Sequence, residues 1–211
     1  MQSVQPSADL SRGKSPDDFY VCLISDRHAV EAWRESSAPF DYTIRSSSWC
    51  ALTCVQNILK IEDKYVPSLN DLFEEACRHG VYVWKDDPAK RGWKGAFLAR
   101  LPAFLNYQGY SARFEQNLTP EGIAQALASD YYVIARVSPE IRFLHDTPPK
   151  EKTGHFVLVY AYETADDGTL VFRIQNSAGF ASLNSQAGVP VSEARMAQVF
   201  SGDAILVRAS H

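Results

Sequence analysis

The sequence has little of what marks secreted, membrane-bound or nucleic-acid-binding proteins. Its 211 residues contain no apolar run near the roughly 18 residues of a membrane span. Residues 1–18 are polar and lack the apolar stretch, about 7–15 residues long, of a signal peptide. No basic run exceeds two residues, and the formal net charge is −4, so we expect no basic face for phosphate groups. These absences predict a cytoplasmic protein that binds neither membranes nor nucleic acid.

Cysteine is scarce, and its spacing does not favour metal binding. The paired cysteine motifs of structural zinc sites are absent, so we expect no metal ion, and we expect no other cofactor. A reducing compartment would keep all the cysteines as thiols. They are Cys22, Cys50, Cys54 and Cys77.

No proline-rich or glycine-rich stretch divides the chain, and its 45% hydrophobic content is enough for one core. Residues 1–17 are expected to be a disordered N-terminus, and residues 18–211 a single domain. Helical patterns dominate the first part of this domain and strand patterns the second, which predicts an α+β fold. The helices are expected at about residues 48–60, 68–78, 94–108, 119 onward and 192–200, and the strands at residues 131–137, 154–163, 170–176 and 204–208.

The most informative segment is the start of the first of these helices, where Cys50 follows three serines and a tryptophan. A thiol is a poor nucleophile until it ionises, and the unpaired N–H groups and positive dipole end of a helix N-terminus stabilise the thiolate. Cys50 lies where this effect is largest. We therefore predict that Cys50 is a nucleophile whose pKa lies well below the ordinary thiol value of about 8.5.

A histidine and an asparagine later in the chain could complete the site. His155 lies on one predicted strand and Asn176 ends the next, and Asp166-Asp167-Gly168 between them is a hairpin turn signal. If the turn centres near Asp167, His155 and Asn176 face each other at the open end of the hairpin, and their side chains can meet. The histidine could then take the thiol proton, while the asparagine carbonyl holds the imidazole in one tautomer.

Three segments in this order resemble the papain-like cysteine peptidases. Trp49-Cys50-Ala51-Leu52-Thr53-Cys54 is similar to the Cys-x-x-x-Cys helix start of the bacteriocin-processing double-glycine peptidases and their stand-alone relatives. Gly154-His155-Phe156-Val157-Leu158-Val159 is similar to their histidine strand. Gln175-Asn176-Ser177-Ala178-Gly179 is similar to the Asn-Ser-Trp-Gly segment of papain, although the double-glycine peptidases usually have Asp in place of the asparagine. The resemblance implies a papain-like α+β fold, in which a helical half with a central nucleophile helix packs on an antiparallel sheet.

The oxyanion site departs from the pattern of that family. Papain-like enzymes usually place a glutamine about six residues before the nucleophile, where its amide stabilises the developing oxyanion. Ile44 occupies that position in this chain. The candidate replacement donors are Thr43, Arg45 and Ser46, together with the backbone N–H of Cys50.

In such a fold the substrate would enter a cleft between the helices and the sheet, lined by the segments that flank the motifs. The candidate substrate-binding residues are Trp49, Trp93, His145 and Ser177. The long loop at residues 138–153 ends immediately before the histidine strand, so we expect it to act as a lid. Its prolines and charged residues suit a solvated linker equally well.

Each assignment has a structural alternative. Cysteine is often buried, so Cys22, Cys54 and Cys77 are expected to be core residues. A histidine such as His155, on an apolar strand, would by itself be a core residue more often than a catalyst. The leading hypothesis is a thiol enzyme that hydrolyses a peptide or isopeptide bond through an acyl-thioester. The alternatives are acyl transfer to an amine and a catalytically silent module that binds a peptide. The Cys-His-Asn order favours the enzymes and the missing glutamine favours the silent module. The partner is a peptide or acyl substrate, and the oligomeric state stays open.

Overall fold

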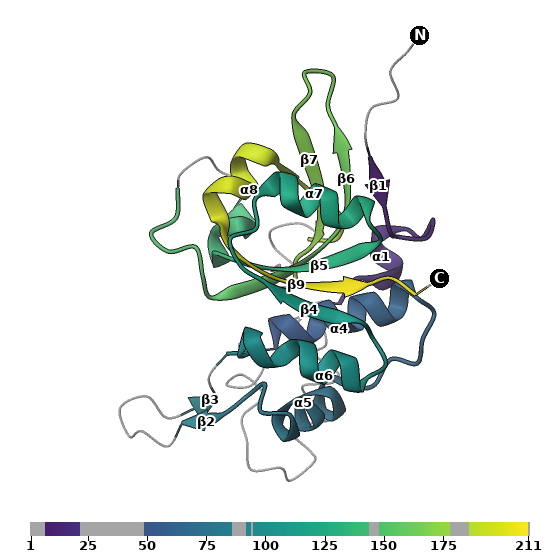
Figure 1. Ribbon diagram of the computed structural model, residues 1–211, viewed down its shortest axis with the longest axis vertical. Helices are drawn as coiled ribbons and strands as arrows, with labels where there is room; N and C mark the ends of the chain where they lie inside the picture. Colours follow the sequence, from purple (N-terminus) through teal and green to yellow (C-terminus); the bar gives the residue numbers. More distant parts are fainter. Residues whose placement is uncertain are drawn as a thin grey trace.

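The computed structural model describes residues 7–21, 49–85, 92–93, 95–143, 148–177 and 186–210 of the chain. Over these residues the protein is a mixed α+β structure with six α-helices and a seven-stranded antiparallel sheet (Figure 1). None of these described helices is long and apolar enough to cross a membrane. The elements follow in the order β1 (Ala8–Asp9), α1 (Pro16–Phe19), α4 (Cys50–Ile61), α5 (Leu69–Arg78), β2 (Trp84–Lys85), β3 (Gly92–Trp93), the 3-10 helix η1 (Leu98–Arg100), α6 (Leu101–Tyr107), β4 (Ala112–Glu115), α7 (Pro120–Ala128), β5 (Tyr131–Val137), the 3-10 helix η2 (Pro139–Phe143), β6 (His155–Thr164), β7 (Leu170–Gln175), β8 (Val189–Ser192), α8 (Glu193–Val199) and β9 (Phe200–Arg208).

Strand β6 lies at the centre of the large sheet. The strand order is β4-β9-β5-β6-β7-β8, and the paired strands are antiparallel. β7 runs along one edge of β6, while the opposite edge pairs first with β5 and then with β1. In the turn between β6 and β7, Gly168 has a φ of +85° and donates its N–H to the carbonyl of Ala165. The hairpin predicted from the Asp-Asp-Gly signal is therefore confirmed.

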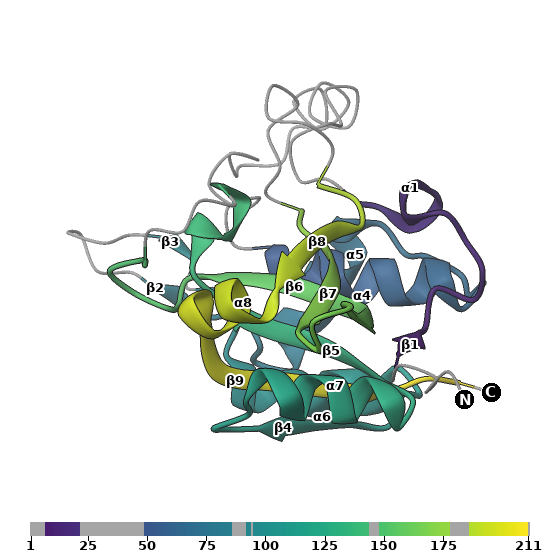
Figure 2. The same ribbon diagram turned by 90° about the horizontal axis from the view of Figure 1, so that it is seen from above.

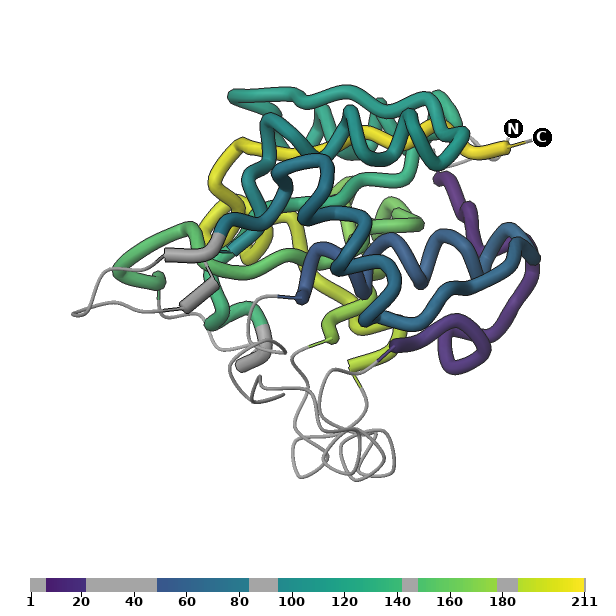
Figure 3. The backbone as a smooth tube through the Cα atoms, turned by 90° about the horizontal axis from the view of Figure 1, so that it is seen from below, coloured from purple at the N-terminus to yellow at the C-terminus, as the bar shows by residue number. Residues whose placement is uncertain are grey.

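Helices cover both faces of this sheet. α4, α5 and α6 lie on one face, and α7 and α8 lie on the other (Figure 1); Figure 3 views the molecule from the side of the first three. In β5, Tyr132 and Ile134 belong to the core on the α4 side. Val133 and Ala135 belong to the core on the α7 side. Because side chains alternate between the faces of a strand, this continuous apolar run supplies both cores.

Helix α4 is buried on almost every side. Eleven of its twelve residues are buried, and it packs against β6 and α5. Its sequence is apolar around most of the circumference, which explains this central position. The helix begins at Cys50 with Trp49 as its N-cap, so the candidate nucleophile is the first helical residue. Ser48, where the sequence predicts the start, lies outside the described residues.

Capping signals in the sequence predict the starts of two other helices correctly. Ser68 caps α5 and Thr119 caps α7, each through a hydroxyl that accepts a backbone N–H from the first turn. The helix predicted at residues 94–108 is wrong in its first half. Pro102 does not bend a long helix; it lies in the first turn of α6, where its missing N–H leaves no hydrogen bond unmade.

Residues 7–17, which the sequence predicts to be disordered, are ordered against the sheet and α4. β1 pairs with β6, and Arg12 lies 3.8 Å from a carboxylate oxygen of the buried Glu62. Phe19, at the end of α1, is fully buried and meets the ring of Tyr160 edge-on, with centroids 5.1 Å apart. α1 also packs against α4 (Figures 1 and 2). A two-residue strand pair and a few side-chain contacts hold this polar segment in place. Such contacts leave no hydrophobic periodicity in the sequence, so the ordered structure of the segment could not be predicted.

We expect Phe19→Ala to lower the free energy of unfolding by about 3–5 kcal/mol, as truncation of a fully buried aromatic side chain does in other cores. Tyr65→Ala is the control, because Tyr65 is 84% exposed and its truncation should change stability by less than about 0.5 kcal/mol. Urea unfolding followed by circular dichroism measures both. Equal stabilities of the two variants would show that this N-terminal segment does not contribute to the fold.

Candidate active site

Three segments carry the candidate catalytic residues toward the start of β6. Cys50 is the first residue of α4, His155 is the first residue of β6, and Asn176 directly follows β7. α4 packs against β6, and β6 pairs with β7. Contacts between elements distant in the sequence therefore assemble this region.

The imidazole and the asparagine side chain are hydrogen-bonded. Nε2 of His155 and Oδ1 of Asn176 lie 2.7 Å apart, and both residues are buried. An amide oxygen only accepts hydrogen bonds, so Nε2 carries the proton and donates it. In the neutral ring this leaves Nδ1 as the basic nitrogen. The prediction that these side chains meet at the open end of the hairpin is confirmed, although a bulge between Val159 and Ala161 shifts the pairing register.

Cys50 lies beside the same strand. Its sulfur is within hydrogen-bonding reach of the backbone N–H of Phe156, the residue that follows His155 in β6. The N–H groups of Cys50 and Ala51, in the first turn of α4, also face the sulfur. All three donors favour the thiolate and lower the pKa of the thiol. The sulfur therefore contacts β6 one residue away from His155.

Burial affects this thiol more than the three N–H groups do. Cys50 is 5% exposed, and its desolvation raises the pKa of the thiol to about 11. The prediction of a pKa well below about 8.5 is therefore wrong for the described structure. The physical reason is that a helix N-terminus stabilises an anion by less than the loss of water destabilises it. At neutral pH the thiol is protonated.

The other described cysteines have structural surroundings. Cys54 lies one turn further along α4, and its Sγ donates to the carbonyl of Cys50 at 3.2 Å. It is buried in the core, as predicted, and burial raises its pKa well above the ordinary value. Cys77 is partly buried, whereas Cys22 lies outside the described residues. Within the described ranges, no cluster of three or more His, Cys, Asp or Glu side chains could hold a metal ion.

Much of the predicted oxyanion and substrate site falls beyond the ranges that the structure describes. The residues concerned are Thr43, Arg45, Ser46 and His145. Their roles stay predictions. Trp93 lies in β3, a short strand that pairs with β2.

Trp49 and Ser177 are described, and both are buried. Trp49 is 1% exposed, and its ring packs against Phe73 with centroids 5.4 Å apart. It belongs to the core around α4 and not to an exposed cleft wall. Ser177 is 2% exposed, and none of the described residues forms a hydrogen bond with its hydroxyl.

The described ends of the loop at residues 138–153 are attached to α8. The carbonyl of Glu140 accepts a hydrogen bond from Arg195 at 2.9 Å. Near the other end, Lys152 donates to the carbonyl of Ala197 at 2.6 Å. The loop is therefore held at both ends, and its action as a lid stays a prediction.

Two residues that the sequence did not single out contact Asn176. The hydroxyl of Tyr20 donates to its backbone carbonyl at 3.0 Å. Oε1 of Gln186 accepts from its Nδ2, also at 3.0 Å. Neither residue belongs to a motif, and no spacing in the sequence relates them to the triad. Only the folded chain brings them to the site.

A third residue, Tyr82, is a buried phenol in the same core as Cys50. It is 2% exposed, and its ring lies 5.1 Å from that of Phe73, which in turn contacts Trp49. Burial and then the electrostatic effect of Cys50 raise the pKa of Tyr82 well above its usual value. Its hydroxyl therefore stays protonated, and no described residue forms a hydrogen bond with it.

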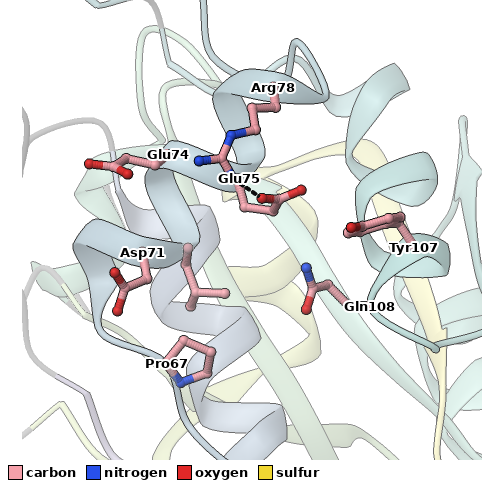
Figure 4. A pocket seen from close by; sticks show the side chains of 8 residues that line it. Pro67, Asp71, Glu74, Glu75, Arg78, Tyr107 and Gln108 are labelled. Carbon is pink, nitrogen blue, oxygen red and sulfur yellow. Dashed lines mark hydrogen bonds and ion pairs between the residues drawn. The ribbon is translucent and has the colours of Figure 1, made fainter.

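An open hollow between α5 and α6 is separate from this site (Figure 4). Its volume is about 360 Å³. The lining residues are Pro67, Asp71, Leu72, Glu74, Glu75, Arg78, Tyr107 and Gln108. Carboxylates dominate it, and the Glu75 carboxylate is paired with Arg78. None of the three candidate catalytic residues lines this hollow.

Comparison of the sequence with protein-family models and with the sequences of curated proteins finds no match. The function is therefore inferred from the chemistry of the site itself. A thiol beside a histidine strand, with the imidazole oriented by a buried amide, can attack a carbonyl carbon and form a thioester. It needs neither a metal ion nor an organic cofactor for that step.

The raised pKa predicts how Cys50 responds to pH. Only the thiolate reacts with iodoacetamide, and below a pKa of about 11 its fraction grows about tenfold per pH unit. Alkylation of Cys50 in the folded protein should therefore be slow at neutral pH and still rise above pH 9 or so. Peptide mapping by mass spectrometry gives the rate at each pH, with urea-unfolded protein as the control. A plateau near neutral pH would instead reveal a thiolate paired with the imidazole.

Proposed function

We propose that this protein is a papain-like thiol enzyme that opens a peptide or isopeptide bond through an acyl-thioester on Cys50. The observation that carries the proposal is the buried 2.7 Å hydrogen bond from His155 to Asn176. The next residue of β6, Phe156, has its backbone N–H within hydrogen-bonding reach of the Cys50 sulfur. The papain-like assignment is supported by the order of the three residues and by a nucleophile helix packed on an antiparallel sheet.

In the proposed reaction, the thiol loses its proton as it attacks. The sulfur of Cys50 bonds to the carbonyl carbon of the substrate while Nδ1 of His155 takes the thiol proton as general base. The imidazolium then gives this proton to the leaving amine as the carbon–nitrogen bond breaks. Asn176 accepts from Nε2–H throughout and keeps the ring in the productive tautomer. Because burial keeps the resting thiol neutral, the imidazole acts during the attack and not before it.

The acyl-thioester can be resolved in two ways. Water attack, with His155 again as base, releases a carboxylic acid and completes a hydrolysis. Attack by an amine transfers the acyl group and completes a transferase reaction. The same triad supports both outcomes, and exclusion of water from the thioester would favour transfer. Hydrolysis is the simpler reaction, because it needs no second binding site.

Two hydrogen-bond donors are needed for the developing oxyanion. The backbone N–H of Cys50, in the first turn of α4, is one candidate. A second candidate is the protonated hydroxyl of Tyr82, which lies in the same core as Cys50, beside the predicted Thr43, Arg45 and Ser46. Loss of one such donor typically raises the barrier by about 2.7–4 kcal/mol.

The burial of the thiol favours a second candidate function. A protonated, 5% exposed Cys50 suits a silent papain-like module that binds a peptide without cleaving it. In that case the hydrogen bond between His155 and Asn176 would only satisfy two buried polar groups. The two functions differ in whether the thiol can be acylated.

The activated ester p-nitrophenyl acetate distinguishes them. We expect intact-mass analysis to find one acetyl group on the wild-type protein, located on Cys50 by peptide mapping, and none on the Cys50→Ala variant. His155→Ala should acetylate about 10²–10⁴-fold more slowly at neutral pH, because the general base is lost. Cys77→Ser is the matched control and should behave like the wild type.

Acetylation spread over several side chains, or an equal rate in the His155→Ala variant, would leave the silent module as the better description. Circular dichroism checks that each variant is folded. Adding an amine such as glycinamide to the acetylated protein separates the two enzyme reactions, because hydrolysis yields acetate and acyl transfer yields acetylglycinamide.

A further inference from the structure

Asn176 is held by hydrogen bonds on both its backbone and its side chain. Its backbone N–H donates to the carbonyl of Gln186 at 3.1 Å, and its backbone carbonyl accepts from the hydroxyl of Tyr20 at 3.0 Å. Its side-chain Nδ2 donates to Oε1 of Gln186 at 3.0 Å, and its Oδ1 accepts from His155 at 2.7 Å. Asn176 and Gln186 are both buried, with Gln186 only 4% exposed. The asparagine therefore has little freedom to move.

The contact with Gln186 determines which way the asparagine amide points. A carboxamide has one end that accepts and one end that donates hydrogen bonds, and the two ends have nearly the same shape. In the structure Gln186 presents its Oε1 atom to Asn176, and because this oxygen can only accept, the NH2 group of Asn176 faces Gln186. The oxygen of Asn176 then faces Nε2 of His155, which must carry the ring proton.

We propose that Gln186 is a positioning residue that sets the tautomer of His155 through Asn176. This inference rests on the proposed function, in which Nδ1 of His155 must be unprotonated to receive the thiol proton of Cys50. If the asparagine amide turned over, its NH2 group would face the imidazole and favour a proton on Nδ1. That tautomer cannot act as the base. Gln186 thereby disfavours the tautomer of His155 that is protonated on Nδ1.

Gln186 can perform this role because its segment is attached to the end of β7. The N–H of Gly188 donates to Oε1 of Gln175 at 3.3 Å, and Nε2 of Gln175 donates to the carbonyl of Pro16 at 2.7 Å. Gly188 has a φ of +62°, and a Cβ there would lie 2.6 Å from the ring of Pro16. The segment that carries Gln186, the end of β7 and the N-terminal segment therefore pack closely together.

The tautomer is measured by long-range proton–nitrogen spectra of the 15N-labelled protein, with His155→Gln used to assign the signals. In the wild type we expect His155 to carry its proton on Nε2. Gln186→Leu removes the acceptor that Gln186 presents to the asparagine amide, so the Nδ1-protonated form should become populated. Gln186→Glu keeps an acceptor at this position and should restore the wild-type tautomer. Gln125→Leu makes the same substitution at an exposed position of α7 and should leave the spectra unchanged.

The kinetic test uses the acetylation of Cys50 by p-nitrophenyl acetate. Gln186→Leu should lower the rate about tenfold, the size expected when the orienting effect of one buried hydrogen bond is lost. Gln186→Glu should recover most of it. In an Asn176→Ala background, Gln186→Leu should have no further effect, because the residue through which it acts is gone. A merely structural role would instead lower the rate by the same factor in both backgrounds.

A proton on Nδ1 in the wild-type protein would overturn the proposal, and this measurement needs no variant to fold. An unchanged tautomer and an unchanged rate in folded Gln186→Leu would overturn it as well. If the tautomer responds to Gln186→Leu but wild-type Cys50 is never acetylated, then Gln186 positions the ring and the proposed enzymatic function fails instead. Thermal unfolding of each variant, followed by circular dichroism, shows whether it is folded.

Discussion

The enclosure of α4 is the constraint on which the rest of the structure depends. This helix is apolar around most of its circumference, so packing on one side alone would leave much apolar surface in water. The chain meets this requirement by placing the sheet on one side of α4 and the helices α1 and α5 on others. Because the helix is held along its whole length, its first residue lies against the start of β6. The position of Cys50 follows from hydrophobic burial, and the chemistry of the site depends on it.

That burial also decides the ionisation of the thiol. A helix N-terminus stabilises an anion by about 0.3–1 kcal/mol, or up to about 2 kcal/mol in partly buried positions. Taking a charged group out of water costs several kcal/mol. At Cys50 the second effect is larger, although three N–H groups face the sulfur. A buried thiol of this kind needs a base that accepts its proton during the reaction. The orientation of His155 then matters more than the dipole of α4.

The polar groups around His155 are connected to parts of the chain that carry no motif. His155 contacts Asn176, Asn176 contacts Tyr20 and Gln186, and Gln175 contacts Pro16. Buried polar groups are stable only when they are satisfied, so these contacts restrict one another. The N-terminal residues thereby become part of the support of the candidate site. Their polar composition resembles that of a solvated tail, but their position beside β7 gives them a structural role.

Several local elements, and the candidate catalytic residues, could be predicted from the sequence. The helix starts at Ser68 and Thr119 and the turn at Asp166-Asp167-Gly168 were predictable, because caps and tight turns depend on neighbouring residues. The contact between His155 and Asn176 followed from that turn. Tertiary structure alone decided the pairing of β1, the strand β8, the contact of Gln186 with Asn176, and the pKa of Cys50. These features depend on which distant segments come into contact and on how much water those contacts exclude. Local sequence patterns predict neither the contacts nor the burial.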